Sequence, residues 1–286
     1  MRKSTIFSIA AIAALGLAGC SGSADKAESS DTQSAEQSSS TGSAGGDLTV
    51  LKVGASPSPH GQILRFVDEN LAEEAGLKIE VVEYADYVQP NEALRSGDLD
   101  ANFFQTVPYL ESESEARGFD FVAGEGVHLE PLGIYSDKIE DIKDLKDGAK
   151  VGIINDPSNQ ARALKLLADQ GLVELPESGE ASVATVTPLR GIELVQVEGP
   201  TLVRALPDVD IAVINGNFAQ EGGLSASEDA LVVESPENNP AVNVLVWSAD
   251  TDKADAIKKL EDLLHSDDVK TFIETTWTDG SVIPAF

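Results

Sequence analysis

The chain has 286 residues, and its 20 Lys and Arg against 49 Asp and Glu give a formal net charge of −29 at pH 7. Nucleic-acid binding requires a basic surface, which this composition excludes. The same acidity would be repelled by anionic lipid head groups, so membrane attachment would have to depend on a lipid anchor. The single cysteine excludes an intramolecular disulfide framework and any zinc site built from several cysteines.

The first 20 residues have the layout of a secretory signal. Arg2 and Lys3 form a basic region, and residues 6–17 form an apolar stretch too short to span a bilayer. Residues 17–20, Leu-Ala-Gly-Cys, resemble the lipobox of bacterial lipoproteins, in which the cysteine is lipidated and the chain is cut before it. We therefore predict a signal peptide over residues 1–19 and a lipid anchor at Cys20, on the extracytoplasmic face of the cell membrane. The alternative is an ordinary signal peptide that ends near a cysteine.

Residues 21–46 contain no aromatic and no large aliphatic side chain. Such a segment cannot bury enough apolar surface to offset the entropy of ordering it, so we predict that residues 20–46 are a disordered tether. A flexible chain of this length would reach roughly 25–30 Å. Without Arg2 and Lys3, the mature chain would carry 18 basic and 49 acidic side chains, a net charge of about −31.

The remaining residues, 47–286, alternate between strand and helix patterns. Asp156 and Pro157 favour a helix start, because Asp is a good N-cap and Pro is tolerated in the first turn. The alternation predicts an α/β fold with mostly parallel sheet. The predicted strands are 48–54, 77–84, 100–104, 119–123, 132–135, 150–155, 192–197, 211–215 and 242–247. The predicted helices end near 74, 96, 117, 148, 171, 206, 265 and 276.

Catalytic and metal-binding signatures are absent from the sequence. The three histidines, His60, His128 and His265, are far apart, and none belongs to a hydrolase or metalloprotease motif. A zinc site built from histidines would need all three to converge from remote segments. The chain also lacks phosphate-binding and dinucleotide-binding glycine motifs. We therefore expect no enzyme activity, no cofactor and no metal.

Several segments together resemble the methionine-binding lipoproteins of bacterial ABC importers, the MetQ/NlpA family. They occur in the family's order from Leu51 to about Trp277. YVQPNEAL, starting at Tyr87, and NDPSNxxR, starting at Asn155, are the most specific. The other segments are LKVGA (51–55), GDLDANFFQ (97–105), PYL (108–110), HLEPLGIYS (128–136), AVIN (212–215) and Val242-Asn243.

This resemblance implies a type II periplasmic-binding-protein clamp, with two α/β lobes and a ligand cleft between them. Lobe 1 would comprise residues 47–131 plus 243–286, and lobe 2 residues 132–242, with crossing segments near 130–134 and 241–245. The resemblance also implies a lipid-anchored, monomeric substrate-binding protein. It would deliver methionine, or a close relative, to the permease of an ABC importer and its ATPase.

The matched segments also supply candidate ligand-binding residues. Arg162 offers a planar, bidentate donor to an α-carboxylate, near the helix end that favours anions. With no carboxylate to pair with in an empty cleft, its removal should change stability little. Asn215 and Asn243 lie in or after apolar strands, where an amide needs a partner. They could bind the ligand or cap backbone groups instead.

Tyr87, Phe104 and Tyr109 would form an aromatic wall for a thioether, unless they only pack in the core. Glu130 and Tyr135 fall at the first crossing segment and could shape the pocket or the hinge.

Two positions depart from the family pattern. Thr106 stands where many members have His, and Phe218 stands where they have Tyr. These departures leave open another amino acid or a methionine-containing dipeptide as ligand. Two hypotheses from other functional classes also remain: an enzyme on the same two-lobe fold, and a surface protein that binds no ligand.

Overall fold

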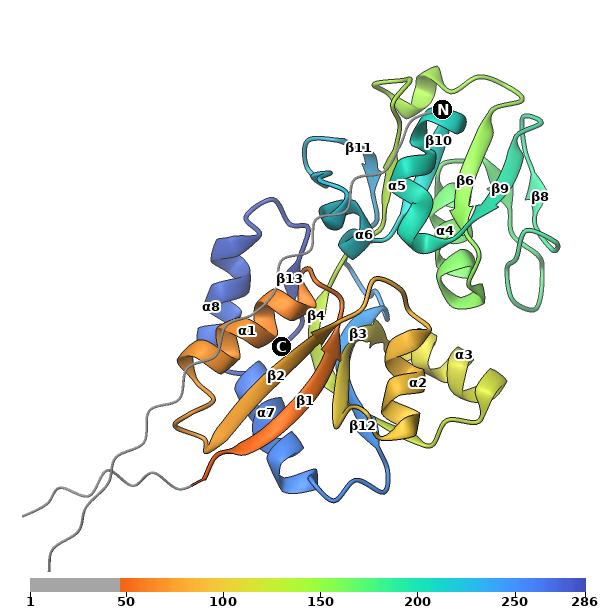
Figure 1. Ribbon diagram of the computed structural model, residues 1–286. Coiled ribbons are helices and arrows are strands. Elements are labelled where there is room, and N and C mark those ends of the chain that lie inside the picture. Colours follow the sequence, from red (N-terminus) through yellow and green to blue (C-terminus); the bar gives the residue numbers. More distant parts are fainter. Residues whose placement is uncertain (1–46) are drawn as a thin grey trace, which may run out of the picture. The chain divides into compact units, whose positions relative to one another are not determined.

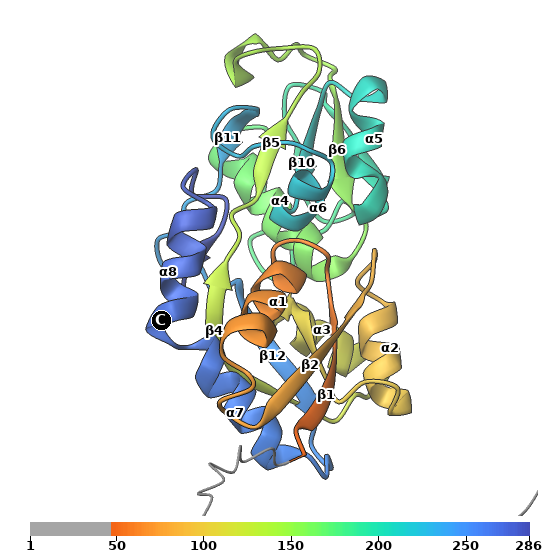
Figure 2. The ribbon, with the colours of Figure 1, turned by 60° about the vertical axis from the view of Figure 1, so that its left-hand side comes forward.

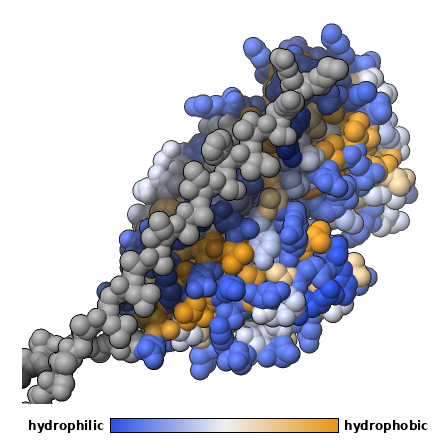
Figure 3. Space-filling model, in the orientation of Figure 1, coloured by the Kyte–Doolittle hydropathy of each residue, from blue (hydrophilic) through white to orange (hydrophobic). Residues whose placement is uncertain are grey.

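A computed structural model of the chain describes residues 47–286. The predicted signal peptide, Cys20 and the tether therefore lie outside the described residues. Two mixed sheets organise the described part, and helices cover both faces of each (Figure 1). None of the helices between residues 47 and 286 is long and apolar enough to cross a bilayer. On the face drawn in Figure 3, hydrophilic side chains cover most of the described surface, and hydrophobic ones are exposed in smaller areas.

The first sheet has the strand order β13-β4-β12-β3-β1-β2. β1 is parallel to β2 and β3, whereas β12 is antiparallel to β3 and β4, and β13 is antiparallel to β4. We call this sheet and its helices lobe 1. Its strands are β1 (Thr49–Ala55), β2 (Leu77–Glu83), β3 (Ala101–Thr106), β4 (Phe121–Leu129), β12 (Val242–Ser248) and β13 (Ile283–Pro284).

Two apolar clusters hold the helices of lobe 1 to opposite faces of the sheet. Ile63, Ile257 and Ile273 bring α1, α7 and α8 against Leu51 and Phe103. Leu94 and Leu110 bring α2 and α3 against Val244 and Val246. These helices are α1 (His60–Asn70), α2 (Gln89–Ser96), α3 (Val107–Arg117), α7 (Ala254–Leu264) and α8 (Asp267–Thr276).

The second sheet has the order β11-β5-β10-β6-β9, and we call it lobe 2 with its helices. β6 is parallel to β9 and β10, whereas β5 is antiparallel to β10 and β11. The strands are β5 (Gly133–Tyr135), β6 (Lys150–Ile154), β9 (Glu193–Val197), β10 (Ile211–Ile214) and β11 (Ala230–Val233). A separate pair is formed by β7 (Val173–Glu174) and β8 (Thr187–Pro188).

The helices of lobe 2 also cover both faces of their sheet. Leu164 and Leu167 of α4 (Pro157–Asp169) contact one core cluster. Leu202 of α5 (Leu202–Ala205) and Phe218 of α6 (Gly216–Glu221) contribute to the other. Three 3-10 turns complete the described elements: η1 (Ile142–Asp144), η2 (Gly199–Thr201) and η3 (Leu206–Asp208). The predicted start of α4 is confirmed, since the Asp156 side chain accepts a hydrogen bond from the backbone N–H of Asn159.

The chain passes between the lobes twice. β4 ends at Leu129 in lobe 1 and β5 begins at Gly133 in lobe 2, a passage that Figure 2 shows from the side. The return lies between β11, which ends at Val233, and β12, which begins at Val242. The prediction of a return near 241–245 was wrong, because residues 242–245 are already paired in the first sheet. The two segments contact each other where the Glu234 N–H donates to the Leu132 carbonyl, 2.8 Å away.

Other predictions need correction as well. The sheets are mixed rather than mostly parallel, because β4, β5, β11, β12 and β13 run antiparallel to their neighbours. The predicted helix over 139–148 is only the 3-10 turn η1, and the strand predicted over 119–123 continues to Leu129. Apart from 3-10 turns, the sequence analysis missed five short helices and strands: α6, β7, β8, β11 and β13.

Candidate ligand-binding site

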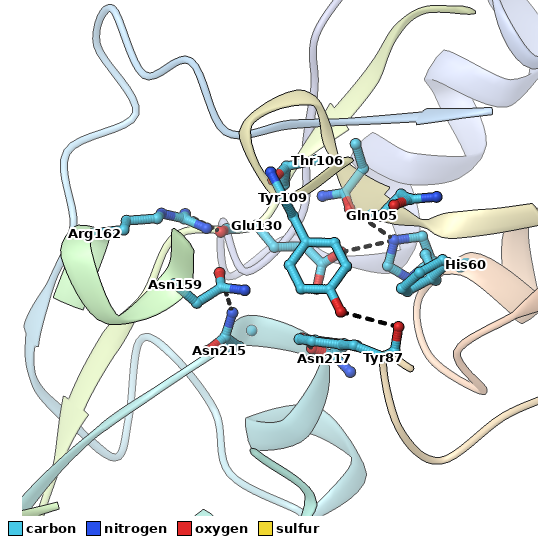
Figure 4. Close-up of a pocket in the computed structure, with 13 residues that line it drawn as sticks. His60, Tyr87, Gln105, Thr106, Tyr109, Glu130, Asn159, Arg162, Asn215 and Asn217 are labelled. Carbon is cyan, nitrogen blue, oxygen red and sulfur yellow. Dashed lines mark hydrogen bonds and ion pairs between the residues drawn. The ribbon is translucent and has the colours of Figure 1, made fainter. Parts of the chain in front are cut away.

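A pocket lies between the two lobes, and both lobes and a crossing segment line it (Figure 4). The seven residues that the sequence singled out for ligand binding all belong to this lining, and their contact with a ligand remains a prediction. The lining residues are His60, Tyr87, Phe104, Gln105, Thr106, Tyr109 and Asn243 from lobe 1, Glu130 from the first crossing segment, and Asn159, Arg162, Asn215, Gly216 and Asn217 from lobe 2. Tyr135 is not among them, since its side chain is buried in a core cluster of lobe 2.

Arg162 reaches the pocket from the second turn of α4. Contrary to the prediction, its guanidinium already has a carboxylate partner. Its Nε lies 2.9 Å from Glu234 Oε1, and its Nη2 lies 2.5 Å from Glu234 Oε2. Nη2 also donates to the Glu130 carbonyl at 2.8 Å. Among the described residues, no hydrogen-bond partner engages Nη1, so this nitrogen is available to a ligand.

The same ion pair joins Arg162 to both crossing segments. Glu234 follows β11, and its Oε2 also accepts the backbone N–H of Leu132 at 3.1 Å. Both side chains of the pair are only 15% exposed, so the pair is shielded from solvent. Removing Arg162 would leave a poorly solvated carboxylate, which is costly. The reason for expecting little change in stability, that Arg162 has no carboxylate to pair with in an empty cleft, is therefore wrong.

The asparagine side chains form buried amide contacts. Asn215 Nδ2 donates to Asn159 Oδ1 at 2.9 Å, and Asn159 Nδ2 contacts Asp156, the N-cap of α4. Although Asn215 stands at the N-cap position of α6, its side chain makes no capping hydrogen bond. Asn243 Oδ1 lies 3.0 Å from His60 Nε2. The backbone-capping alternative therefore does not hold for Asn215, and its carbonyl oxygen is left for other partners.

Two histidines meet at Glu130, a cluster that the sequence analysis did not anticipate. Glu130 Oε1 lies 2.8 Å from His128 Nε2 and 3.3 Å from His60 Nε2. Burial raises the pKa of Glu130, and it lowers the pKa of His60 to about 4 and that of His128 to about 3. Both imidazoles are therefore neutral at pH 7. His128 can donate its Nε2 N–H to Glu130, whereas the Nε2 N–H of His60 is directed at Asn243 Oδ1. The His128 donor stabilises the Glu130 carboxylate in a site that desolvates it.

The cluster has the residue types of a metal site, since the ligand atoms of His60, His128 and Glu130 lie within 4.8 Å of one another. The Nδ1 atoms of both histidines are buried without a hydrogen-bond partner in the described part of the chain. Metal-binding histidines almost always donate that second N–H to a carboxylate, carbonyl or water, which fixes the ring. The arrangement therefore fits a hydrogen-bonded network around Glu130 better than a metal centre.

Aromatic rings form one wall of the pocket. Tyr87 stacks on Phe218 with ring centroids 4.7 Å apart, and Tyr109 meets Tyr87 edge-on at 5.6 Å. The Tyr109 hydroxyl donates to the Tyr87 carbonyl at 3.0 Å, as Figure 4 shows, and the Tyr87 hydroxyl donates to Asn217 Oδ1 at 2.5 Å. Phe104 meets Tyr109 edge-on, with ring centroids 6.0 Å apart. Burial raises the pKa of Tyr87 well above its usual value, so its hydroxyl remains a neutral donor.

Comparison with known proteins identifies the family. Residues 51–286 match the model of the NlpA lipoprotein family. The chain belongs to this family. It is 36% identical over 238 residues to the D-methionine-binding lipoprotein MetQ of Escherichia coli K12, which covers 81% of this chain and 87% of the relative. It is 36% identical over 222 residues to the probable D-methionine-binding lipoprotein MetQ of Pasteurella multocida, covering 77% and 80% of the two chains.

Solved structures of similar proteins confirm the two-lobe substrate-binding-protein fold. A putative lipoprotein of Actinomyces odontolyticus superposes with a TM-score of 0.82 and 62% identity, over 84% of this chain and all of that one. A periplasmic substrate-binding protein of an ABC transporter from Coxiella burnetii gives 0.78 at 36% identity, over 82% of this chain and all of that one. A nutrient-binding protein from Burkholderia cenocepacia, solved bound to methionine, gives 0.78 at 38% identity with the same coverage.

Some lining residues that the sequence analysis missed lie in or near segments it had recognised, and others were indicated by no sequence pattern. Asn159 lies in the NDPSNxxR segment, where only Arg162 was given a role. Asn217 and Gly216 follow a predicted strand in the helix α6, which was not predicted. Gln105 ends the matched segment GDLDANFFQ but was given no role. His60 gave no signal, because its partners His128 and Asn243 are distant in sequence.

Proposed function

We propose that this protein binds methionine, or a close relative of it, in the pocket between the lobes and delivers it to an ABC importer. The pocket composition carries the proposal. Within residues 47–286, the charged groups that line it are the Arg162 guanidinium and the Glu130 carboxylate, since His60 is neutral. One cationic and one anionic group complement the carboxylate and the ammonium of a zwitterionic amino acid.

The remaining lining fits an apolar side chain that contains sulfur. The rings of Tyr87, Phe104 and Tyr109 lie together at one wall. Thioether sulfur makes favourable contacts with aromatic rings, worth about 0.3–1.5 kcal/mol each. The relatives named for methionine binding and the methionine-bound structure support the same ligand class. Proton abstraction or nucleophilic attack would need an activated group in the pocket, and the buried Glu130 is instead engaged by two histidines.

Addition of L- or D-methionine is expected to raise the melting temperature of the ligand-free protein. A ligand that binds only the native state stabilises it by about 2.7 kcal/mol at a hundredfold excess over Kd. Thermal unfolding with and without ligand measures the shift, after unfolding and refolding to remove bound cargo. Methionine methyl ester, which lacks the carboxylate, is the matched control. The proposal is wrong if neither methionine nor any other amino acid or methionyl dipeptide shifts the transition.

The membrane location is part of the same proposal, with Cys20 as the lipidated residue and the body on the extracytoplasmic face. Cys20→Ala is expected to release the protein from the membrane fraction and leave its binding of methionine unchanged. The reason is that every residue that lines the pocket lies between His60 and Asn243, remote in sequence from Cys20. Fractionation after a salt and carbonate wash measures the release, with Ser21→Ala as the control. Retention of Cys20→Ala in washed membranes would disprove the anchor.

A further inference from the structure

A second contact between the lobes lies outside the pocket, at the end of α6. Gln220 belongs to lobe 2, and its Oε1 accepts two hydrogen bonds from lobe 1. Ser58 Oγ, in the loop before α1, lies 2.8 Å from it, and Trp277 Nε1, directly after α8, lies 3.0 Å from it. The indole N–H can only donate, so the atom that faces it must be the amide oxygen. One atom of lobe 2 thus joins two separate segments of lobe 1.

The short helix α6 connects this contact to the pocket. Gly216 and Asn217 in its first turn line the pocket, and Gln220 lies one turn later. Phe218, between them, stacks on Tyr87 of lobe 1. The helix also fits closely against the crossing segment, because a Cβ added at Gly216 would lie 2.8 Å from Glu130 Cβ. A displacement of Gln220 from lobe 1 would therefore move the pocket wall with it.

A second hydrogen bond between the lobes lies near the Gln220 contact. Ser225 Oγ, in the loop after α6, donates to Asp279 Oδ2 at 3.2 Å. Asp279 is held in place by the N–H and hydroxyl of Ser281, at 3.1 and 2.7 Å from its Oδ1. Trp277 is fixed by its edge-on contact with Phe272 in the lobe 1 core. Trp277 and Asp279, the lobe 1 partners of Gln220 and Ser225, are thus each held by contacts within lobe 1.

We propose that Gln220 is an interlobe latch, a positioning residue that stabilises the arrangement of the lobes in which the pocket is formed. This inference rests on the proposed function, because it assigns Gln220 an effect on ligand release. Apparent affinity falls in proportion to the population of the binding-competent arrangement. Loss of the latch therefore weakens binding although Gln220 does not line the pocket.

Gln220→Met tests the latch, since it keeps the length of the side chain and removes the acceptor. We expect affinity for methionine to fall about tenfold, which corresponds to about 1.4 kcal/mol, with most of the change in the dissociation rate. Gln220→Glu keeps an acceptor facing Ser58 and Trp277 and should bind within about threefold of the unmodified protein. Thr278→Ala is the matched control. This exposed residue lines a surface groove together with Gln220 and Trp277, and it donates no hydrogen bond to the described residues of lobe 2.

A measurement without ligand tests the Gln220 contact independently of the proposed function. The sequence has two tryptophans, so an NMR spectrum of the protein labelled with 15N-tryptophan shows two indole N–H signals, and Trp247→Phe assigns them. In Gln220→Met, the Trp277 signal should exchange with solvent at least about tenfold faster, while the Trp247 signal stays unchanged. Unchanged Trp277 exchange overturns the latch, and so does faster exchange with unchanged affinity. Failure of the unmodified protein to bind any amino acid would overturn the proposed function and leave this readout intact.

Discussion

Arg162→Ala is expected to lower the affinity for methionine by roughly 30- to 4000-fold. Truncating one partner of a buried, charge-assisted pair costs about 2–5 kcal/mol. Glu234 holds the Nε and Nη2 edge of the guanidinium, so Nη1 is the nitrogen left to face a ligand carboxylate. Calorimetry on both proteins measures the loss. The affinity for methionine methyl ester should change far less, because that ligand has no carboxylate to lose a partner.

The same substitution is also expected to destabilise the ligand-free protein, by about 1–3 kcal/mol. It removes the partner of Glu234, whose side chain is only 15% exposed, and the bond from Nη2 to the Glu130 carbonyl. The double variant Arg162→Ala, Glu234→Gln should recover part of this stability, because the Glu234 position then carries no charge that has lost its partner, and it should not recover binding. Near-normal affinity in Arg162→Ala would show that the ligand does not contact this arginine.

The order of the central elements could be predicted from local sequence alone. The start of α4 depended on Asp156 and Pro157, which act within one turn, and apolar runs such as 150–155 marked buried strands. Antiparallel pairing could not be predicted in this way. β12 inserts between β3 and β4 although more than 100 residues separate it from either strand. No local pattern records such a partner, so the sheets were predicted to be mostly parallel.

The site residues also divide into those that a sequence segment indicated and those that only tertiary contacts bring together. Segments such as YVQPNEAL and NDPSN placed Tyr87 and Arg162 in the lining through their resemblance to a family. The partner of Arg162 was missed, because Glu234 is one of 49 acidic residues and lies 72 positions away. His60 and His128 were treated as isolated for the same reason, since only the fold brings both to Glu130. Pairings that arise from tertiary contact set the charge state of the pocket, and composition does not show them.

Glu130→Gln is expected to weaken methionine binding by a similar factor, roughly 30- to 4000-fold, through loss of the charge that faces the ligand ammonium. The pocket would then keep Arg162 as its charged group, so an anionic ligand should be favoured over a zwitterion. The analogue of methionine that lacks the amino group should therefore bind the variant at least as well as it binds the unmodified protein. Calorimetry with methionine and this analogue gives the comparison.

Stability should respond to Glu130→Gln in the opposite sense to Arg162→Ala. Gln keeps an oxygen that can accept from His128 Nε2, and the variant no longer buries a carboxylate that is 5% exposed and whose pKa is raised by that burial. Replacing a desolvated charge by a neutral group of the same shape is often neutral or stabilising. The ligand-free variant should therefore melt at the same or a higher temperature. A protein that melts lower and still discriminates methionine from its deaminated analogue would show that Glu130 supports the fold and does not bind the ammonium.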